Sequence, residues 1–307
     1  LDARHEVRLA NDRLITWIAP ASGGQIYELD VRSICHNLLA TLARRPEAYH
    51  EKILAGPGGQ NGEVASIHDR VVFKQEGLDR EIQYDAQVRK SLQDHFYNPD
   101  VSLAQVVDGT AVEQGDFLTG AYEARVRRNP DRIQVQLVRD GKVWDQPIRI
   151  TKGVTLAAGS SQLEIAYMLE NLPHNYPMHF AVELNFAGLP DGADDRYFYD
   201  AQGNSLGQLG SQLDLIDAER VGLVDQWLGI DVALSLDRPS GIWTYPIRTV
   251  SQSEGGFERV HQSVVVQPHW IVQGDAEGRW SVKMNLAIET TRAEKHGLQQ
   301  PAIAATH

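Results

Sequence analysis

The sequence has very little cysteine and no long hydrophobic run. Its single cysteine, Cys35, excludes an internal disulfide and any metal site built from several cysteines, and we expect it to be a small buried apolar residue. No apolar run approaches the roughly 20 residues that cross a bilayer, and no signal peptide is visible. We therefore expect a cytoplasmic protein with no membrane partner.

Familiar catalytic and cofactor motifs are also absent. There is no glycine-rich nucleotide loop, no HExxH and no GxSxG. The net charge of −12 argues against binding to nucleic acid. Two acidic groups lack the pattern of a calcium loop and are interpreted as solvated loops: Asp191, Asp194 and Asp195, and Asp214, Asp217 and Glu219. We expect no cofactor and no metal.

What the chain does have is a strand-like alternation of apolar and polar residues from Val101 onward. Met178, Phe180 and Val182 share one face of such a strand. Turn residues recur about every ten positions, a spacing typical of a β-sandwich or barrel. We predict an all-β fold, a large antiparallel sandwich of two extended sheets, with residues 1–291 as a single domain and 292–307 as a frayed tail.

A few short helices are expected near the N-terminus. Leu38, Leu39 and Leu42 have helical spacing, and Pro46 limits that helix. A second helical pattern, ending at Asn98-Pro99, is formed by Val88, Leu92 and Phe96. Between them lies a charged cluster, either a helix end with its ion pairs or a docking surface: Arg44, Arg45, Glu47, Tyr49 and His50.

The stretch from Pro246 to Trp270 predicts a hairpin that turns at Glu254-Gly255-Gly256. Polar groups beside flat aromatic rings suit a neutral sugar. The candidate carbohydrate contacts are Trp243, Tyr245, Arg248, Glu254, Glu258, Arg259 and His269. The alternative is an ordinary exposed hairpin with solvated charges and two tryptophans in the core.

Two further segments carry candidate residues. On the strand from Met178 to Phe186, His179 and Glu183 share the polar face and could move protons at a sugar carbon, or the face could be a wet outer surface. In the second segment, residues 91–97, Asp94 and His95 could face a groove, or Asp94 could accept a hydrogen bond from a neighbouring backbone amide.

Several stretches resemble the C-terminal β-sandwich of the α-amylase/4-α-glucanotransferase branch of glycoside hydrolase family 57. They follow the family's order over nearly the whole chain: GGQIYELD (23–30), NLLATLARRPEAYHEKI (37–53), SLQDHF (91–96), GDF (115–117), HFAVELNFAGL (179–189) and TVSQSEGGFERVHQSVVVQPHW (249–270). The resemblance implies a supersandwich similar to galactose mutarotase.

In that family the catalytic carboxylates belong to an N-terminal (β/α)₇ barrel, and nothing in this sequence looks like one. No catalytic residue is therefore carried over. The start without Met favours an excised C-terminal piece. The resemblance implies a non-catalytic module that packs on the barrel and helps hold an α-1,4-glucan or maltooligosaccharide. Two alternatives stay open: a mutarotase-like epimerase using Glu183 with His179 or His269, and a purely structural docking domain.

Overall fold

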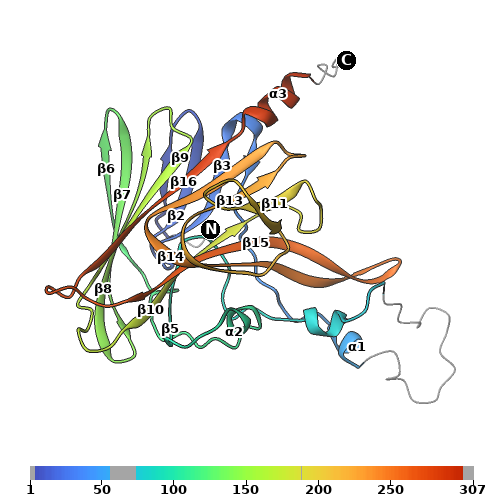
Figure 1. Ribbon diagram of the computed structural model, residues 1–307, viewed down its shortest axis with the longest axis horizontal. Helices are drawn as coiled ribbons and strands as arrows, with labels where there is room; N and C mark the ends of the chain where they lie inside the picture. Colours follow the sequence, from blue (N-terminus) through green and yellow to red (C-terminus); the bar gives the residue numbers. More distant parts are fainter. Residues whose placement is uncertain (1–3, 56–73, 188, 300–307) are drawn as a thin grey trace.

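Antiparallel strands form nearly all the regular structure in the computed structural model, which describes residues 4–55, 74–187 and 189–299 (Figure 1). A four-stranded sheet has the order β1-β2-β3-β4. Its strands are β1 (Val7–Ala10), β2 (Leu14–Ala19), β3 (Gln25–Val31) and β4 (His36–Asn37).

The larger sheet has twelve strands, with a main path β12-β11-β13-β14-β16-β9-β8-β7-β6 and a branch in which β14 pairs with β15, β15 with β10 and β10 with β5. These strands are β5 (Gln93–Tyr97), β6 (Glu123–Asn129), β7 (Arg132–Val143), β8 (Gln146–Ala157), β9 (Gln162–Glu170), β10 (Met178–Phe186), β11 (Arg196–Tyr199), β12 (Ser205–Gln208), β13 (Leu213–Asp225), β14 (Ile230–Ser253), β15 (Gly256–Val272) and β16 (Trp280–Glu289). The predicted large antiparallel β-sandwich is confirmed.

Strand β14 connects the two layers of this sandwich because it is long enough to belong to both. Its first part pairs with β16 from Asp231 to Leu236, and its second part pairs with β15 from Gly241 to Ser253. The main apolar core lies between the layers, where the alternating residues Phe180, Val182 and Leu184 of β10 are buried. The period-two pattern of the sequence therefore identified the inward face of β10 correctly.

The opposite face of β10 is also covered, so the expected wet outer surface is wrong. All nine residues of β10 are buried, including His179, Glu183 and Asn185. A second apolar cluster forms on this face, where Val106 of helix α2 (Leu103–Val107) joins Tyr97, Trp243 and residues of neighbouring strands. Residues 82–89, before this helix, and residues 106–113, at its end, cover the sheet here and partly enclose a space above it.

Helices are few among the described residues, and both predicted ones are wrong. Leu39 and Leu42 form isolated β-bridges, to Phe186 and Arg89, and Phe96 lies in strand β5. Sheet pairing outweighs the local helical spacing in both places. The short helices present are α1 (His50–Leu54), α2, and the 3₁₀ turns η1 (Arg32–Ile34) and η3 (Leu78–Glu81). Helix α3 (Thr291–Gln299) occupies part of the tail expected to be frayed.

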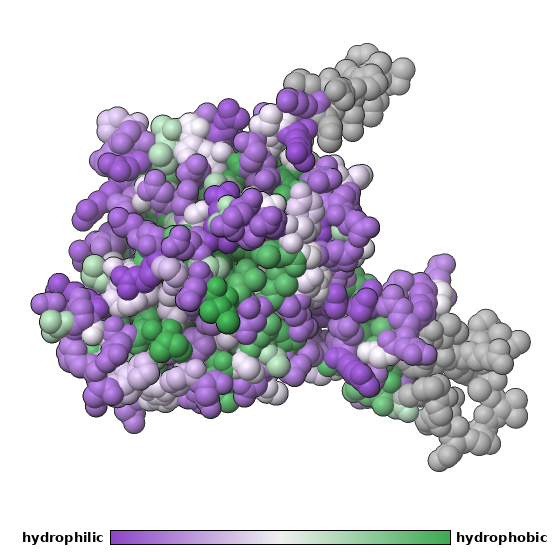
Figure 2. Space-filling view, viewed as in Figure 1, coloured by the Kyte–Doolittle hydropathy of each residue, from purple (hydrophilic) through white to green (hydrophobic). Residues whose placement is uncertain are grey.

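The surface in Figure 2 is mostly hydrophilic, with an apolar area over the middle, where β14 and β15 lie in Figure 1. Cys35 is exposed, not buried as expected, and it ends the η1 turn in a left-handed conformation with φ of 50°. None of the described helices has the length and apolar character needed to span a membrane.

Candidate functional site

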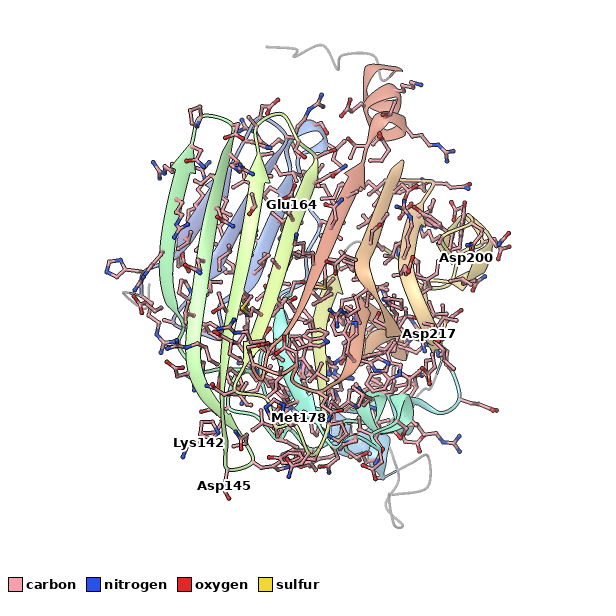
Figure 3. The ribbon with its side chains drawn as sticks, turned by 60° about the vertical axis from the view of Figure 1, so that its left-hand side comes forward. Lys142, Asp145, Glu164, Met178, Asp200 and Asp217 are labelled. Atoms are coloured by element: carbon pink, nitrogen blue, oxygen red, sulfur yellow. The ribbon has the colours of Figure 1, made fainter. Side chains whose placement is uncertain are left out.

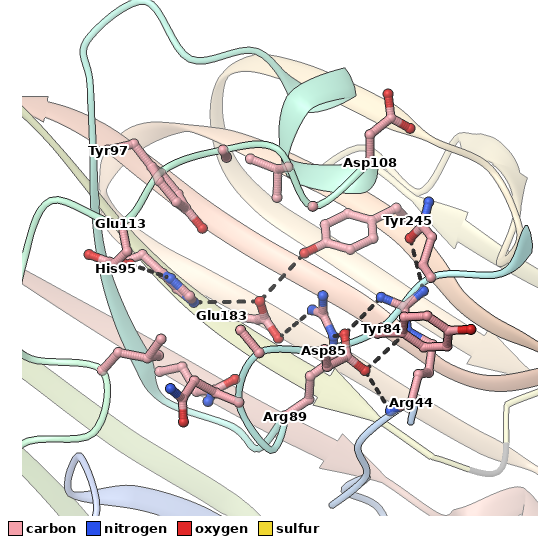
Figure 4. Close-up of a pocket in the computed structure, with 18 of the residues that line it drawn as sticks. Arg44, Tyr84, Asp85, Arg89, His95, Tyr97, Asp108, Glu113, Glu183 and Tyr245 are labelled. Atoms are coloured by element: carbon pink, nitrogen blue, oxygen red, sulfur yellow. Dashed lines mark hydrogen bonds and ion pairs between the residues drawn. The ribbon is translucent and has the colours of Figure 1, made fainter. Parts of the chain in front are cut away.

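A pocket of about 380 Å³ lies on the covered outer face of β5, β10 and β14 (Figure 4). Strands supply its floor, and two chain segments, 82–89 and 106–113, form its walls. Its polar and aromatic lining residues include Arg44, Gln83, Tyr84, Asp85, Arg89, Gln93, His95, Tyr97, Asp108, Glu113, Glu183 and Tyr245. Its volume is in the range of about 300–1,000 Å³ that small-molecule sites occupy.

Glu183 is the centre of an ionic network on the pocket floor. Arg89 Nη1 lies 3.0 Å from Glu183 Oε1, and Asn185 Nδ2 donates to the same oxygen at 2.6 Å. On the other oxygen, His95 Nε2 lies 3.5 Å away and the Tyr245 hydroxyl donates at 3.4 Å. Both carboxylate oxygens are therefore occupied by protein groups.

Asp85 extends the network along the pocket wall. Arg44 binds it with two parallel bonds, Nη2 to Oδ1 at 2.7 Å and Nε to Oδ2 at 3.0 Å, and Arg89 Nε donates to Oδ1 at 2.8 Å. Burial acts to raise the pKa of Asp85, but the bonds from Arg44 and the charge of Arg89 outweigh it, so this pKa is lowered. Paired guanidinium and carboxylate groups of this kind fix each other's orientation.

The same balance sets the charges of His95 and Glu183. Burial would lower the pKa of His95, but its bonds to Glu113 and Glu183 raise it to about 9. Burial would raise the pKa of Glu183, but the charge of Arg89 and the contact with His95 lower it to about 2. At neutral pH His95 is therefore an imidazolium between two carboxylates, and Glu183 is ionised.

Aromatic side chains stand beside these charges. Tyr97 and Tyr245 are buried, while Tyr84 is 46% exposed at the pocket wall. The Tyr97 hydroxyl accepts a bond of 3.1 Å from Gln267 Nε2, which leaves its own proton free to be donated. Flat rings beside fixed hydrogen-bonding groups are suited to a neutral polyol such as a sugar.

The pocket brings together three of the sequence-predicted residues, His95, Glu183 and Tyr245, and it excludes Asp94. Asp94 points to the other face of β5, where it is 1% exposed. Its carboxylate accepts from Lys152 Nζ at 2.8 Å and from the hydroxyls of Tyr122 and Tyr167. Asp94 is thus wrong as a carbohydrate contact, since it is enclosed in the core.

His179 and His269 form a pair of their own. His179 Nε2 lies 2.9 Å from His269 Nδ1, and the ring of Trp243 stacks on His269 with centroids 3.8 Å apart. Burial and the charge of His179 lower the pKa of His269 to about 3. Trp243 is 2% exposed and donates to Asp214, so it offers no open ring face.

The predicted cluster around the 254–256 turn does not form. His269 pairs with Gly241, at the opposite end of the β14–β15 hairpin from the pair Ser253 and Gly256 beside the turn. The charged residues near the turn are engaged in ion pairs: Arg248 with Asp191 at 2.8 Å, Glu258 with Lys74 at 2.8 Å and Arg259 with Glu81 at 3.4 Å. Glu254 does not line the pocket.

Several pocket residues were missed by the sequence reasoning. Asp85, Arg89 and Glu113 carry no local signal of this role, because apolar spacing identifies buried faces and not the partners of Glu183. Arg44 did stand out, in a charged cluster interpreted as a helix end or a docking surface, but its partner Asp85 is 41 residues away. The antiparallel bridge between Leu42 and Arg89 places Arg44 beside Asp85, and the pairing of β5 with β10 places His95 beside Glu183.

Fold and site together define the class, a large antiparallel β-sandwich with a covered polar pocket on one sheet. The family model "Alpha-amylase/4-alpha-glucanotransferase, C-terminal" matches residues 1–284. The chain therefore belongs to this C-terminal domain family, as the sequence resemblance indicated.

Relatives agree with this assignment. The chain is 32% identical over 280 residues to a 4-alpha-glucanotransferase of Thermococcus kodakarensis, covering 91% of this chain and 39% of the relative. It is 26% identical over 267 residues to Alpha-amylase 1 of Dictyoglomus thermophilum, covering 85% and 37%. The chain thus spans less than two fifths of each relative's length.

Solved structures show the same fold. The crystal structure of the 4-alpha-glucanotransferase from Thermococcus litoralis superposes with a TM-score of 0.70 at 26% identity, covering 94% of this chain and 38% of that one. A putative aldose 1-epimerase from Klebsiella pneumoniae gives a TM-score of 0.53 at 9% identity, covering 94% and 80%. At that identity the likeness concerns the fold alone.

Proposed function

We propose that this chain is the non-catalytic C-terminal module of an α-glucan-acting enzyme, of the α-amylase or 4-α-glucanotransferase type, and that its pocket holds part of an α-1,4-glucan. The family match and the span of less than two fifths of each relative support this proposal. The partner in the same protein would be an N-terminal catalytic barrel. A cytoplasmic location belongs to the proposal, and the exposed free thiol of Cys35 is compatible with a reducing compartment.

The observation that carries the proposal is that protein groups already contact both carboxylate oxygens of Glu183. A general base works best when its pKa lies near the operating pH, whereas that of Glu183 is about 2. His95, with a pKa of about 9, is held between Glu113 and Glu183. Groups fixed in this way present a preorganised hydrogen-bonding surface, which favours binding and disfavours proton transfer.

The epimerase alternative needs Glu183 to act with His179 or His269. Among the described residues, those histidines bond to each other and form no hydrogen bond or ion pair with Glu183. Burial lowers the pKa of His179, and that of His269 is about 3, so neither is an acid at neutral pH. This geometry does not favour epimerisation. The other alternative, a purely structural docking domain, would be favoured if the binding test below gave no signal.

Calorimetric titration of the chain with maltotriose tests the proposal. We expect a saturable signal, weakened about tenfold or more by Tyr84→Ala, because this substitution removes an exposed aromatic wall without breaking the ionic network. Glu258→Gln on the hairpin is the matched control and should leave the titration unchanged. Silence up to tens of millimolar sugar, beyond the roughly 4 kcal/mol that correspond to 1 mM affinity, would contradict binding and leave docking. Polarimetry on fresh α-glucose should show no rate above buffer.

A further inference from the structure

A second aromatic residue stands out on the surface, far more exposed than the pocket tyrosines. Trp227 lies in the turn between β13 and β14 and is 70% exposed, although tryptophan is on average highly buried. The turn itself is well ordered by hydrogen bonds. Asp225 Oδ1 accepts from the Leu228 amide at 2.8 Å, and the Gly229 amide donates to the Asp225 carbonyl at 2.9 Å. The ring is thus held outward by a fixed backbone.

A cation lies beside this ring and restricts its orientation. The guanidinium carbon of Arg196, in β11, is 5.8 Å from the Trp227 ring centroid. Arg196 is itself fixed, by Asp225 at 3.1 Å and by Asp195 at 2.9 Å. A tryptophan held by a paired arginine loses little conformational freedom when a ligand stacks on it.

We propose that Trp227 is a second, surface site for α-glucan, on which the apolar face of a sugar ring stacks. The choice of ligand rests on the proposed function. The ring is the only tryptophan or tyrosine more than half exposed among the described residues, and Gln226 beside it supplies an exposed amide. Such a platform requires no charge on its ligand, which suits a neutral polymer.

The platform and the pocket are formed by different residues, since Trp227 is not among those that line the pocket. The turn that carries Trp227 joins β13 to β14, and β13 pairs with β11. Residues of α2 and β5 line the pocket, and these two elements lie below β11 and β13 in the view of Figure 1. Two sites on one rigid body bind a polymer more tightly than a short oligosaccharide, because engagement at one site raises the effective concentration at the other. Trp227 should therefore contribute to the binding of long glucan chains and not to that of maltotriose in the pocket.

The test compares two exposed tryptophans. Trp227→Ala removes the platform, and Trp144→Asn removes a ring that is 38% exposed at the β7–β8 turn, where φ of 51° suits asparagine. Asp145, next to Trp144, and Asp200, just after β11, lie on opposite sides of the view in Figure 3. The two readouts are mobility in native gels that contain amylose and calorimetric titration with maltotriose.

We expect Trp227→Ala to weaken amylose binding by about tenfold and to leave the maltotriose titration unchanged, while Trp227→Phe keeps most of the binding. Trp144→Asn should change neither readout. The platform would be overturned if Trp227→Ala left the mobility in amylose gels unchanged, or if Trp227→Ala and Trp144→Asn lost amylose binding equally. In either case the proposed function would stand. If the unsubstituted chain bound neither ligand, the proposed function would fail, and the platform with it.

Discussion

Two buried ionic clusters lie on opposite faces of strand β5, and they begin at consecutive residues. Asp94 points into the core between the layers, whereas His95 points to the outer face. Both clusters contain a buried carboxylate with a cationic partner. The outer cluster borders a pocket, whereas the side chains of Asp94 and Lys152 in the inner cluster are 0% exposed, so burial of charge does not by itself identify a binding site.

The inner cluster is closed on all sides. Lys152 donates to Asp94, to the Gly23 carbonyl and to the Leu92 carbonyl, and its side chain is 0% exposed. Three acceptors in fixed positions satisfy the three N–H groups of the ammonium, as a buried ion requires. We interpret this cluster as a device that holds β5 and β8 in place.

The outer cluster differs because its walls are segments of mainly irregular chain in place of sheet. Residues 82–89 and 106–113 approach Glu183 from two sides and leave space between them. Its charges are paired by protein groups, yet Arg44, Arg89 and the half-exposed Tyr84 line the cavity. The comparison therefore suggests that a charged cluster becomes a site when a loop, and not a second sheet, covers it.

The largest expected effect is at the inner cluster. Lys152→Met leaves the Asp94 carboxylate buried without its cation, and we expect a loss of about 3–5 kcal/mol in the free energy of unfolding, measured by urea denaturation. The double variant with Asp94→Leu should recover most of this loss, because no charge then remains buried. A single variant as stable as the unsubstituted chain would show that the pair is not needed.

The outer cluster should lose less stability and more function. In Glu183→Gln, Arg89 keeps Asp85 and His95 keeps Glu113, so we expect a loss of about 2 kcal/mol in the free energy of unfolding. Maltotriose binding should be lost in calorimetry, since the pocket floor rearranges. Full binding with reduced stability would mean that Glu183 supports the fold and not the site.

The charges of the outer cluster also predict a pH dependence. The raised pKa of His95 gives stability that is fully present below about 6.5, its unfolded value, and is lost as the pH rises through about 9. The lowered pKa of Glu183 gives stability present above about 4.5 and lost as the pH falls toward about 2. Urea midpoints of the unsubstituted chain should therefore fall between pH 6.5 and 9.5. His95→Gln should flatten that slope, and an unchanged slope would contradict this assignment.

The smallest effect is expected at the hairpin near residue 254. Glu258→Gln breaks an exposed ion pair with Lys74, and exposed pairs of this kind contribute little. We expect urea denaturation and the maltotriose titration to match those of the unsubstituted chain. A loss of sugar affinity in this variant would return the binding site to the hairpin.

The sequence predicts the fold better than the site, for a physical reason. The alternation along β10 reveals its inward residues, because the hydrophobic effect places apolar side chains such as Phe180 and Val182 in the core. The alternation does not tell whether other segments cover the opposite face of the strand. Glu183 and His179 were therefore considered as residues of an outer face, whereas α2 and its flanking segments bury that face. A spacing of four residues at Val88, Leu92 and Phe96 indicated a helix, but Phe96 lies in strand β5, which pairs with β10.

The site was predicted in part because residue type reveals chemistry but not neighbours. Tyr245 and His95 were singled out for the hydrogen bonds and ring faces that a sugar needs, and both line the pocket. Trp243 was chosen for the same reason, and the fold buries it against His269. Asp85 had no local signal at all, because its role depends on Arg44 and Arg89.

Hydrogen exchange of the chain with and without maltotriose tests the central claim most directly, since it reads every segment at once. The account predicts slower exchange in 82–89 and 106–113 when the sugar is bound, with no change at 253–258. Slower exchange confined to 253–258, with the two pocket walls unchanged, would contradict it and place the sugar on the hairpin.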